Sequence, residues 1–251
     1  MPTDLQTAES ERCIDNFSLH ESDYEHRSRL GDAPRDVTVF SRGDSSGLHL
    51  SATSSGSGNR IFLSDGVRGE LNVNFEGSDS VIFIGRDTTL TALTIGSRQS
   101  DDFVAIGNDV ASTGPGRWIS GLRAADHRPG IIVGDAVVIA RDVVIRNTDG
   151  HPIFDSTLSS QVNAASSDLV IEPHSWIGER AAILKNVTIG AFSIVGFAAV
   201  VHESVPRHHR AQGNPARVKV NQDRIWAWDD SDDGLARARK YLAKFPINET
   251  S

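Results

Sequence analysis

Aliphatic residues recur every six positions through the second half of the chain. Nine anchors, each Ile or Val, share this column, which breaks only once: Val133, Ile139, Ile145, Ile171, Ile177, Ile183, Ile189, Val195 and Val201. Amphipathic helices repeat at three and four positions and half-buried strands at two, so neither explains a period of six. About six residues make one flat face of a triangular coil, and three faces make a coil of about eighteen. The pattern therefore predicts an all-β solenoid of stacked parallel strands.

The same spacing continues upstream with more irregularity, at Ile84, Leu90, Ile95 and Ile106. β-branched and aliphatic anchors suit a buried, pleated surface, and each coil buries its apolar edge only against its neighbours. We expect the β-helix to occupy residues 59–218.

Several segments depart from the repeat. Residues 1–58 are expected to be a polar N-terminal extension, poorly ordered or loosely packed over 1–35 and with a possible single strand over 36–40. A Ser/Gly-rich linker is expected over 51–58. Residues 111–130 and 154–168 are expected to be loop insertions, and long loops in a regular solenoid are often functional.

The last segment, 219–251, is expected to carry a short amphipathic α-helix. Its apolar residues fall at helical spacing: Leu235, Ala238, Tyr241, Leu242 and Phe245. Ser231 is a candidate N-cap, and acidic residues at 232–233 complement the start of the helix dipole.

Charge and composition narrow the possible partners. The formal net charge of −8 argues against nucleic acid or an anionic membrane as the main partner. No apolar run is long enough to span a bilayer, and the first thirty residues lack the apolar core of a secretion signal. The lone cysteine, Cys13, excludes an intramolecular disulfide framework and fits a reducing cytoplasm. We therefore expect a cytoplasmic protein.

One titratable residue occupies the aliphatic column. Continuing the column from Ile145 by six reaches His151, where the regular coil breaks into a loop. A histidine here could simply cap the coil, which is the ordinary role of such a residue. Its context, Asp149-Gly150-His151-Pro152-Ile153, favours a chemical role instead.

That segment and those that follow resemble the sugar and capsular polysaccharide O-acetyltransferases of the hexapeptide-repeat acyltransferase superfamily. The family carries D-x-H-P-I, R-I-N, H-x-W-I-G, I-L-K-x-V-x-I-G and G-N-P-A-[KR]-[VI] motifs. The matching segments of this chain are Asp149–Ile153, Gln161-Val162-Asn163, His174–Gly178, Ile183–Gly190 and Gly213–Val218, with a trailing Ile225-Trp226. The resemblance covers about residues 80–228, and the motifs are specific as a set.

The resemblance implies a left-handed winding, acetyl-CoA as co-substrate without a metal, and a bacterial homotrimer with its sites between subunits. It implies that His151 is the general base, since an imidazole can accept a proton from a sugar hydroxyl near neutral pH. Asp149, Asp155 or a backbone carbonyl would orient its ring. Trp176 would lie beside the thioester, where it or a backbone N–H stabilises developing charge. The implied cofactor-binding residues are Gly178, Lys185, Phe197, Ala198, His202 and Arg217.

The chain also departs from the family pattern. Glu203 stands where a phosphate-facing lysine is expected, and a basic cluster nearby could replace it: Arg207, His208, His209, Arg210 and Arg217. Glu172 replaces the usual glycine and precedes a proline, so this coil corner, close to Trp176, is expected to be irregular.

Two alternatives remain open from the sequence. A γ-carbonic-anhydrase-like enzyme would hold zinc with three histidines, for which His127, His151 and His174 are candidates. A non-catalytic hexapeptide scaffold would not need a histidine at the interrupted hexad. For the acetyltransferase, a capsular or other cell-surface polysaccharide is the first choice of acceptor, ahead of a free sugar. The 111–130 insertion, with Trp118 and three arginines, could bind an acidic sugar.

Overall fold

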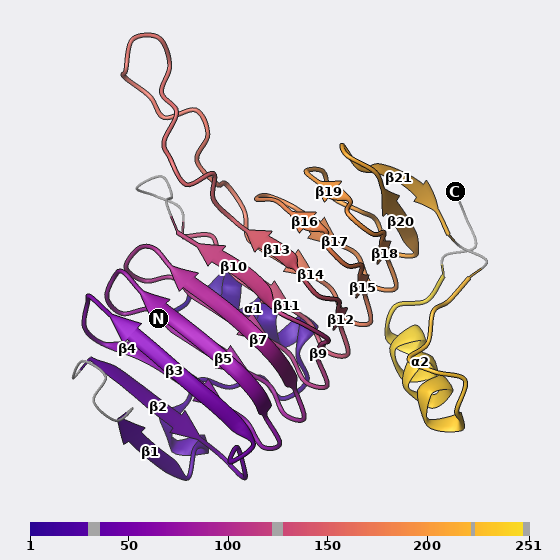
Figure 1. The fold of residues 1–251 in the computed structure, drawn as a ribbon, viewed down its shortest axis with the longest axis horizontal. Helices are drawn as coiled ribbons and strands as arrows, with labels where there is room; N and C mark the ends of the chain where they lie inside the picture. Colours follow the sequence, from indigo (N-terminus) through magenta and orange to yellow (C-terminus); the bar gives the residue numbers. More distant parts are fainter. Residues whose placement is uncertain (30–35, 122–127, 222–223, 248–251) are drawn as a thin grey trace.

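The computed structural model describes residues 1–29, 36–121, 128–221 and 224–247, and it consists mostly of strands in parallel sheets (Figure 1). An eight-stranded sheet forms the first face. Its strands are β1 (His26–Arg29), β2 (Val37–Ser41), β4 (Asn59–Leu63), β6 (Val81–Ile84), β8 (Phe103–Ile106), β11 (Ile131–Val133), β14 (Leu169–Ile171) and β17 (Thr188–Ile189). All of its pairs are parallel except that of β1 with β2.

The second sheet bends to give two more faces. The second face contains β9 (Ala111–Ser112), β12 (Val138–Ile139), β15 (Trp176–Ile177), β18 (Ile194–Val195), β20 (His209–Gln212) and the antiparallel β21 (Arg217–Val220). The third face contains β10 (Gly116–Ser120), β13 (Val143–Arg146), β16 (Ala182–Ile183) and β19 (Val200–Val201). β3 (Leu48–Ser54), β5 (Arg68–Phe75) and β7 (Thr89–Ser97) continue this sheet upstream, and β7 pairs with both β9 and β10.

The six-residue spacing produces this stacking. Ile177 pairs with Val195 and Ile183 with Val201, eighteen residues apart in both cases. All nine anchors lie in one core cluster and are at most 2 % exposed. The predicted parallel sheets and short C-terminal helix are confirmed.

The corners of the coils have a conformation that the anchor pattern alone did not predict. Seven of the nine anchors are followed three residues later by a residue with φ of 54–61°: Ala136, Asp142, His174, Arg180, Asn186, Phe192 and Ala198. Such a left-handed conformation is uncommon outside glycine, asparagine and aspartate. It recurs here because each coil must turn between one short strand and the next.

The stacked strands begin earlier than residue 59. β2 already pairs with β4, and β3 pairs with β5 along its whole length, including part of the expected 51–58 linker. These coils are longer than those downstream, since Leu63 pairs with Ile84 and Ile84 with Ile106, 21 and 22 residues on. The added residues hide the six-residue period there.

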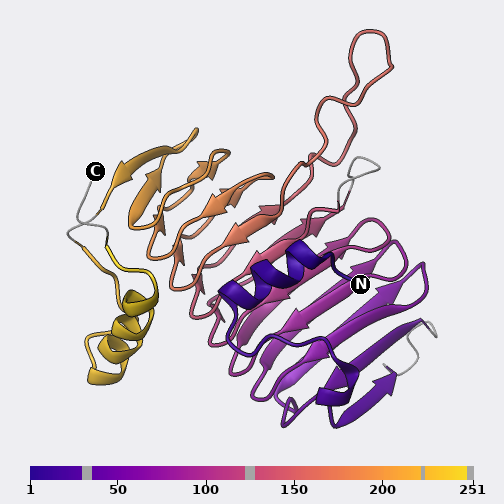
Figure 2. The ribbon, with the colours of Figure 1, turned by 180° about the vertical axis from the view of Figure 1, so that it is seen from behind.

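The N-terminal segment is not loosely packed as expected. Helix α1 (Asp4–Cys13) is closed by a capping box at Thr3, and a 3₁₀ turn, η1 (Glu21–Asp23), follows. The segment packs on the outer side of the first face (Figure 2), where the residues are apolar: Phe40, Phe62, Phe83, Phe103, Ala105, Ile132 and Val170. The N-terminal segment shields this apolar outer surface from water. Burial between the segment and the sheet raises the pKa of Cys13 to about 12.

Much of the expected 111–130 insertion belongs to the coils. It contains β9 and β10, and Trp118 is 1 % exposed within the core. Trp118 therefore cannot contact an acceptor as expected. Arg123 and His127 lie outside the described residues.

The C-terminal helix forms where the spacing predicted it. α2 (Asp232–Lys244) starts after Ser231, whose hydroxyl accepts a hydrogen bond from the Gly234 amide at 3.1 Å. Tyr241 and Phe245 pack against Ala136, Ala191 and Phe192 at the edge between the first and second faces. Neither α-helix in the described ranges is long and apolar enough to cross a bilayer.

Candidate functional site

A long loop leaves the stack of three-faced coils, called the prism below, at the edge between the third and first faces (Figure 1). It follows β13 and ends at β14, so the insertion expected at 154–168 is present and starts slightly earlier. Asn147 is the first residue of this loop, and its side chain anchors the start of the loop. The buried Asn147 amide donates to the Pro129 carbonyl at 2.8 Å, and its oxygen accepts from the Gly121 amide at 3.1 Å.

His151 lies exposed near the start of this loop, and Asn163 fixes its backbone. The Asn163 amide nitrogen donates to the His151 carbonyl and to Asp149 Oδ2, both at 2.9 Å. The Asn163 oxygen accepts from the Ile153 amide at 2.7 Å. Asn163 therefore joins the two arms of the loop on either side of the histidine. The motif Gln161-Val162-Asn163 marked this residue in the sequence without indicating that role.

The two carboxylates considered as partners of His151 are occupied elsewhere. Lys185 forms an ion pair with Asp149 and donates to the Asn163 carbonyl at 2.5 Å. Burial tends to raise the pKa of Asp149, but the bonds from Lys185 and Asn163 lower it overall. Bonds from Ser159 and Thr157 lower the pKa of Asp155 to about 2. Lys185, expected at the cofactor, thus anchors the loop in this chain.

Trp176 lies on the second face, away from the loop edge. It starts β15 between Val138 and Ile194 of the adjacent coils, and it is 42 % exposed. Gly178 follows at the corner, where an added Cβ would lie 2.7 Å from the Val195 carbonyl oxygen. Glycine is required there by the stacking of the coils.

The remaining expected cofactor residues divide between two edges. Phe197, 62 % exposed, and Ala198 lie at the corner of the second and third faces, one coil after Gly178. The Arg180 guanidinium is 5.8 Å from the centre of the Phe197 ring. His202 follows β19 at the loop edge, and Arg217 is exposed at the start of β21. Within one chain the contacts of Asp149 and Asn163 link the His151 segment to Lys185, but Trp176 on the second face is not brought together with His151.

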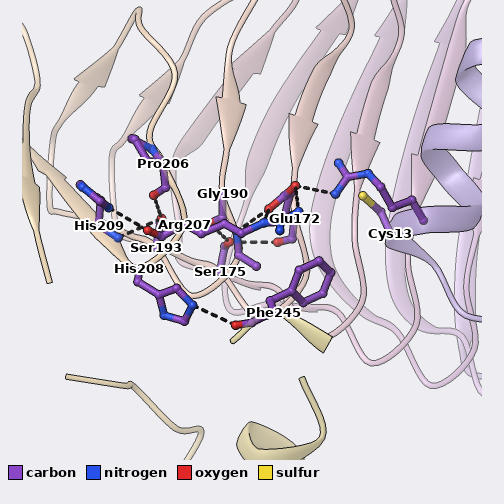
Figure 3. Close-up of polar contacts among 12 residues, drawn as sticks. Cys13, Glu172, Ser175, Gly190, Ser193, Pro206, Arg207, His208, His209 and Phe245 are labelled. Atoms are coloured by element: carbon purple, nitrogen blue, oxygen red, sulfur yellow. Dashed lines mark hydrogen bonds and ion pairs between the residues drawn. The ribbon is translucent and has the colours of Figure 1, made fainter. Parts of the chain in front are cut away.

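Glu172 forms a buried ionic cluster at the edge of the first and second faces (Figure 3). Its side chain is 6 % exposed and binds the Arg207 guanidinium at 2.6 and 2.8 Å and Arg12 at 2.5 Å. It also accepts from the Ala191 amide at 2.8 Å. Burial opposes ionisation, yet these bonds lower the pKa of Glu172 to about 2. The departure from glycine thus ties α1 and two coils together.

The basic cluster that follows β19 is only partly available for phosphate. Arg207 is held by Glu172 and lies with its guanidinium 4.6 Å from the centre of the Phe245 ring. His208 is buried, and its Nε2 donates to the Phe245 carbonyl at 2.9 Å. The C-terminal segment buries His208, whereas Arg207 stays partly exposed but has its guanidinium engaged by Glu172.

His174 belongs to a column of corner residues beneath the C-terminal segment. It lies between Ala136 and Phe192 in successive coils, with the Phe192 ring at 4.6 Å. Its Nε2 donates to the Trp226 carbonyl at 3.1 Å. Burial lowers the pKa of His174 to about 4. His174 and His151 lie at different edges, and no cluster of three metal-ligating side chains occurs among the described residues, so the zinc alternative gains no support.

We predict that His174 makes the protein less stable as the pH falls from about 6.5 to 4. The unfolded chain takes up a proton in this range, whereas folded His174 stays neutral down to about 4. The free energy of unfolding should therefore fall by up to about 3 kcal/mol across the range. Denaturant unfolding at several pH values measures this, and the fall should be smaller in His174→Asn. An unchanged pH dependence in that variant, relative to an exposed-site His49→Asn control, would contradict the prediction.

No family model matches the chain. The polysialic acid O-acetyltransferase of Escherichia coli O1:K1 is 33% identical over 128 residues, which are 50% of this chain and 41% of that protein. The chain thus spans less than half the length of that curated relative. The crystal structure of the polySia-specific acetyltransferase NeuO matches with a TM-score of 0.69 and 25% identity, over 90% of this chain and 98% of that one. The polysialic acid O-acetyltransferase OatWY matches in fold, with a TM-score of 0.60, 20% identity and coverage of 82% and 98%. These comparisons confirm the resemblance to polysaccharide O-acetyltransferases that the motifs indicated.

Proposed function

We propose that this chain transfers an acetyl group from acetyl-CoA to a hydroxyl of a capsular or other cell-surface polysaccharide. The observation that carries the proposal is the histidine-bearing loop where the hexad column from Val133 to Val201 is interrupted. The match to NeuO over 90% of the chain supports it. We infer the left-handed winding of the coils from the same resemblance. A cytoplasmic location stays a prediction.

In this proposal His151 is the general base. It accepts the proton of the acceptor hydroxyl as the oxygen attacks the thioester carbonyl, and it returns a proton to the departing CoA thiolate. The Asn163 and Lys185 contacts hold the loop backbone in place for both transfers. Trp176, or a backbone N–H near it, stabilises the negative charge that develops on the carbonyl oxygen.

We place acetyl-CoA along the corner of the second and third faces. Gly178 and Ala198 allow close approach to the backbone, and Phe197 offers an exposed apolar surface beside Arg180. We also propose exposed Arg217, at the start of β21, and His202, just after β19, as phosphate contacts. Lys185 forms an ion pair with Asp149 in this structure, and its expected contact with acetyl-CoA stays a prediction.

We propose a homotrimer with active sites between subunits. The N-terminal segment already covers much of the first face, which leaves the second and third faces for contact with other copies. The projecting loop carries apolar side chains that are largely exposed: Ile153, Phe154, Leu158 and Val162. A neighbouring copy that covers these residues would also bring His151 of one subunit toward Trp176 of another.

The function is tested by following CoA release from acetyl-CoA with a panel of acceptors. We expect turnover with an acidic polysaccharide such as polysialic acid, less with free monosaccharides, and none with serine or an antibiotic. Product acetylation is checked by mass spectrometry. Turnover with serine alone, or with no saccharide of the panel, would contradict the proposed function.

A further inference from the structure

The C-terminal segment returns to the turn that precedes Trp176. After β21 the chain brings Trp226 against His174, 52 positions earlier in the sequence. The Trp226 indole nitrogen donates to the His174 carbonyl at 3.0 Å, while His174 Nε2 donates to the Trp226 carbonyl at 3.1 Å. The two rings stack with centroids 4.3 Å apart and planes at 15°. Two hydrogen bonds and one stacking contact thus fix both the position and the plane of the Trp226 ring.

The support beneath this pair is buried and hydrogen-bonded. The His174 amide donates to the Asp135 carbonyl at 2.9 Å, and the His174 side chain is fully buried between Phe192 and Tyr241. Tyr241 comes from α2, so the helix holds His174 from the outer side. Trp226 is therefore held against the prism by these contacts.

Trp226 also contacts the candidate catalytic tryptophan. Its ring centroid lies 6.3 Å from that of Trp176, with the planes tilted by 50°, within the range of a favourable aromatic pair. On the two neighbouring strands Trp176 is paired with the narrower side chains Val138 and Ile194, and it is 42 % exposed. An exposed side chain with few neighbours samples several rotamers, and an aromatic wall on one side reduces that choice.

We propose that Trp226 is a positioning residue for acetyl transfer, which holds the indole of Trp176 in the orientation that the reaction requires. The inference rests on the proposed function, because it assumes that Trp176 acts at the thioester. A displacement of about 1 Å in a group at the reacting centre costs on the order of 100-fold in rate. The chain thus uses its C-terminal segment to complete the site from outside the hexad repeat.

The test is a double-mutant cycle on acetyl transfer to polysialic acid. We expect Trp226→Ala to lower kcat by about 10- to 100-fold with little change in KM for acetyl-CoA. Trp226→Phe, which keeps a stacked ring, should recover most of the activity. The kcat of the double variant Trp176→Ala/Trp226→Ala should lie within about twofold of that of Trp176→Ala alone, because Trp226 acts only through Trp176. Trp228→Ala, two positions away and packed under Arg237, is the matched control and should retain full kcat.

A spectroscopic measurement separates the inference from plain stability. The paired indoles should give an exciton signal in circular dichroism that both Trp176→Phe and Trp226→Phe remove and Trp228→Phe retains. Suppose that Trp176→Ala lowers kcat and that adding Trp226→Ala lowers it again by the full factor of the single variant. That result would overturn the positioning role and leave the proposed function intact. Full activity of Trp176→Ala would instead overturn the assigned role of Trp176 and the inference with it.

Discussion

Replacing His151 with alanine is expected to lower kcat for acetyl transfer by about 10²–10⁴-fold, the usual contribution of a general base. The fold should not change, because His151 is exposed and the loop is held through its backbone carbonyl, Asn163 and the Asp149–Lys185 pair. CoA release with polysialic acid measures the rate, and denaturant unfolding measures stability. His49→Ala, on the exposed side of β3, is the matched control and should retain activity.

The same variant tests whether the site lies between subunits. His151→Ala and Trp176→Ala chains, refolded together, should recover part of the activity, since some interfaces then contain one intact His151 and one intact Trp176. Absence of recovery in verified mixed oligomers would contradict a shared site. Full activity of His151→Ala alone would show that another group takes the proton.

Replacing Glu172 with alanine is expected to lower the free energy of unfolding by about 2–4 kcal/mol at neutral pH. The change removes both bonds to Arg207, the bond to Arg12 and the acceptor of the buried Ala191 amide. Both guanidinium groups are partly exposed and regain water, which keeps the cost below that of two stranded charges. Denaturant unfolding gives the value.

Glu76→Ala is the matched control for that experiment. Its partner Arg98 lies 3.8 Å away with both side chains about 40 % exposed, so the loss should stay below about 1 kcal/mol. Because the pKa of Glu172 is lowered to about 2, its contribution is full above about 4.5 and disappears as the pH falls toward 2. Equal losses of unfolding free energy in Glu172→Ala and Glu76→Ala would show that burial does not strengthen the ion pairs of Glu172.

The buried core could be predicted from the sequence because aliphatic residues at a single period of six form it. Every anchor from Val133 to Val201 is buried as the spacing predicted. Upstream the period fails because the coils are three to four residues longer, so the sequence placed the start of the stack at residue 59, although β2 and β3 already pair with β4 and β5. The apolar outer residues that the N-terminal segment covers, such as Phe62 and Phe83, also lie outside the anchor column.

The candidate site was predictable only where motifs are contiguous. His151 and Trp176 could be selected because one replaces an anchor and the other adjoins one. Their separation on different edges depends on coil geometry, which spacing does not give. The link between Trp226 and His174, and that between Glu172 and Arg12, join positions far apart in sequence. Residue types alone do not identify such pairs.

The strands at the two ends of the stack have a consequence for polymerisation. A parallel solenoid exposes at each end a row of backbone groups that a second molecule could extend coil upon coil. Here β1 pairs antiparallel with β2 on the first face, and β21 pairs antiparallel with β20 on the second. A further coil that stacked on either strand would therefore have to join a mixed sheet, without the uniform parallel pairing of the coils within the stack. These two antiparallel strands thus interrupt the repeat that growth along the stacking axis would continue.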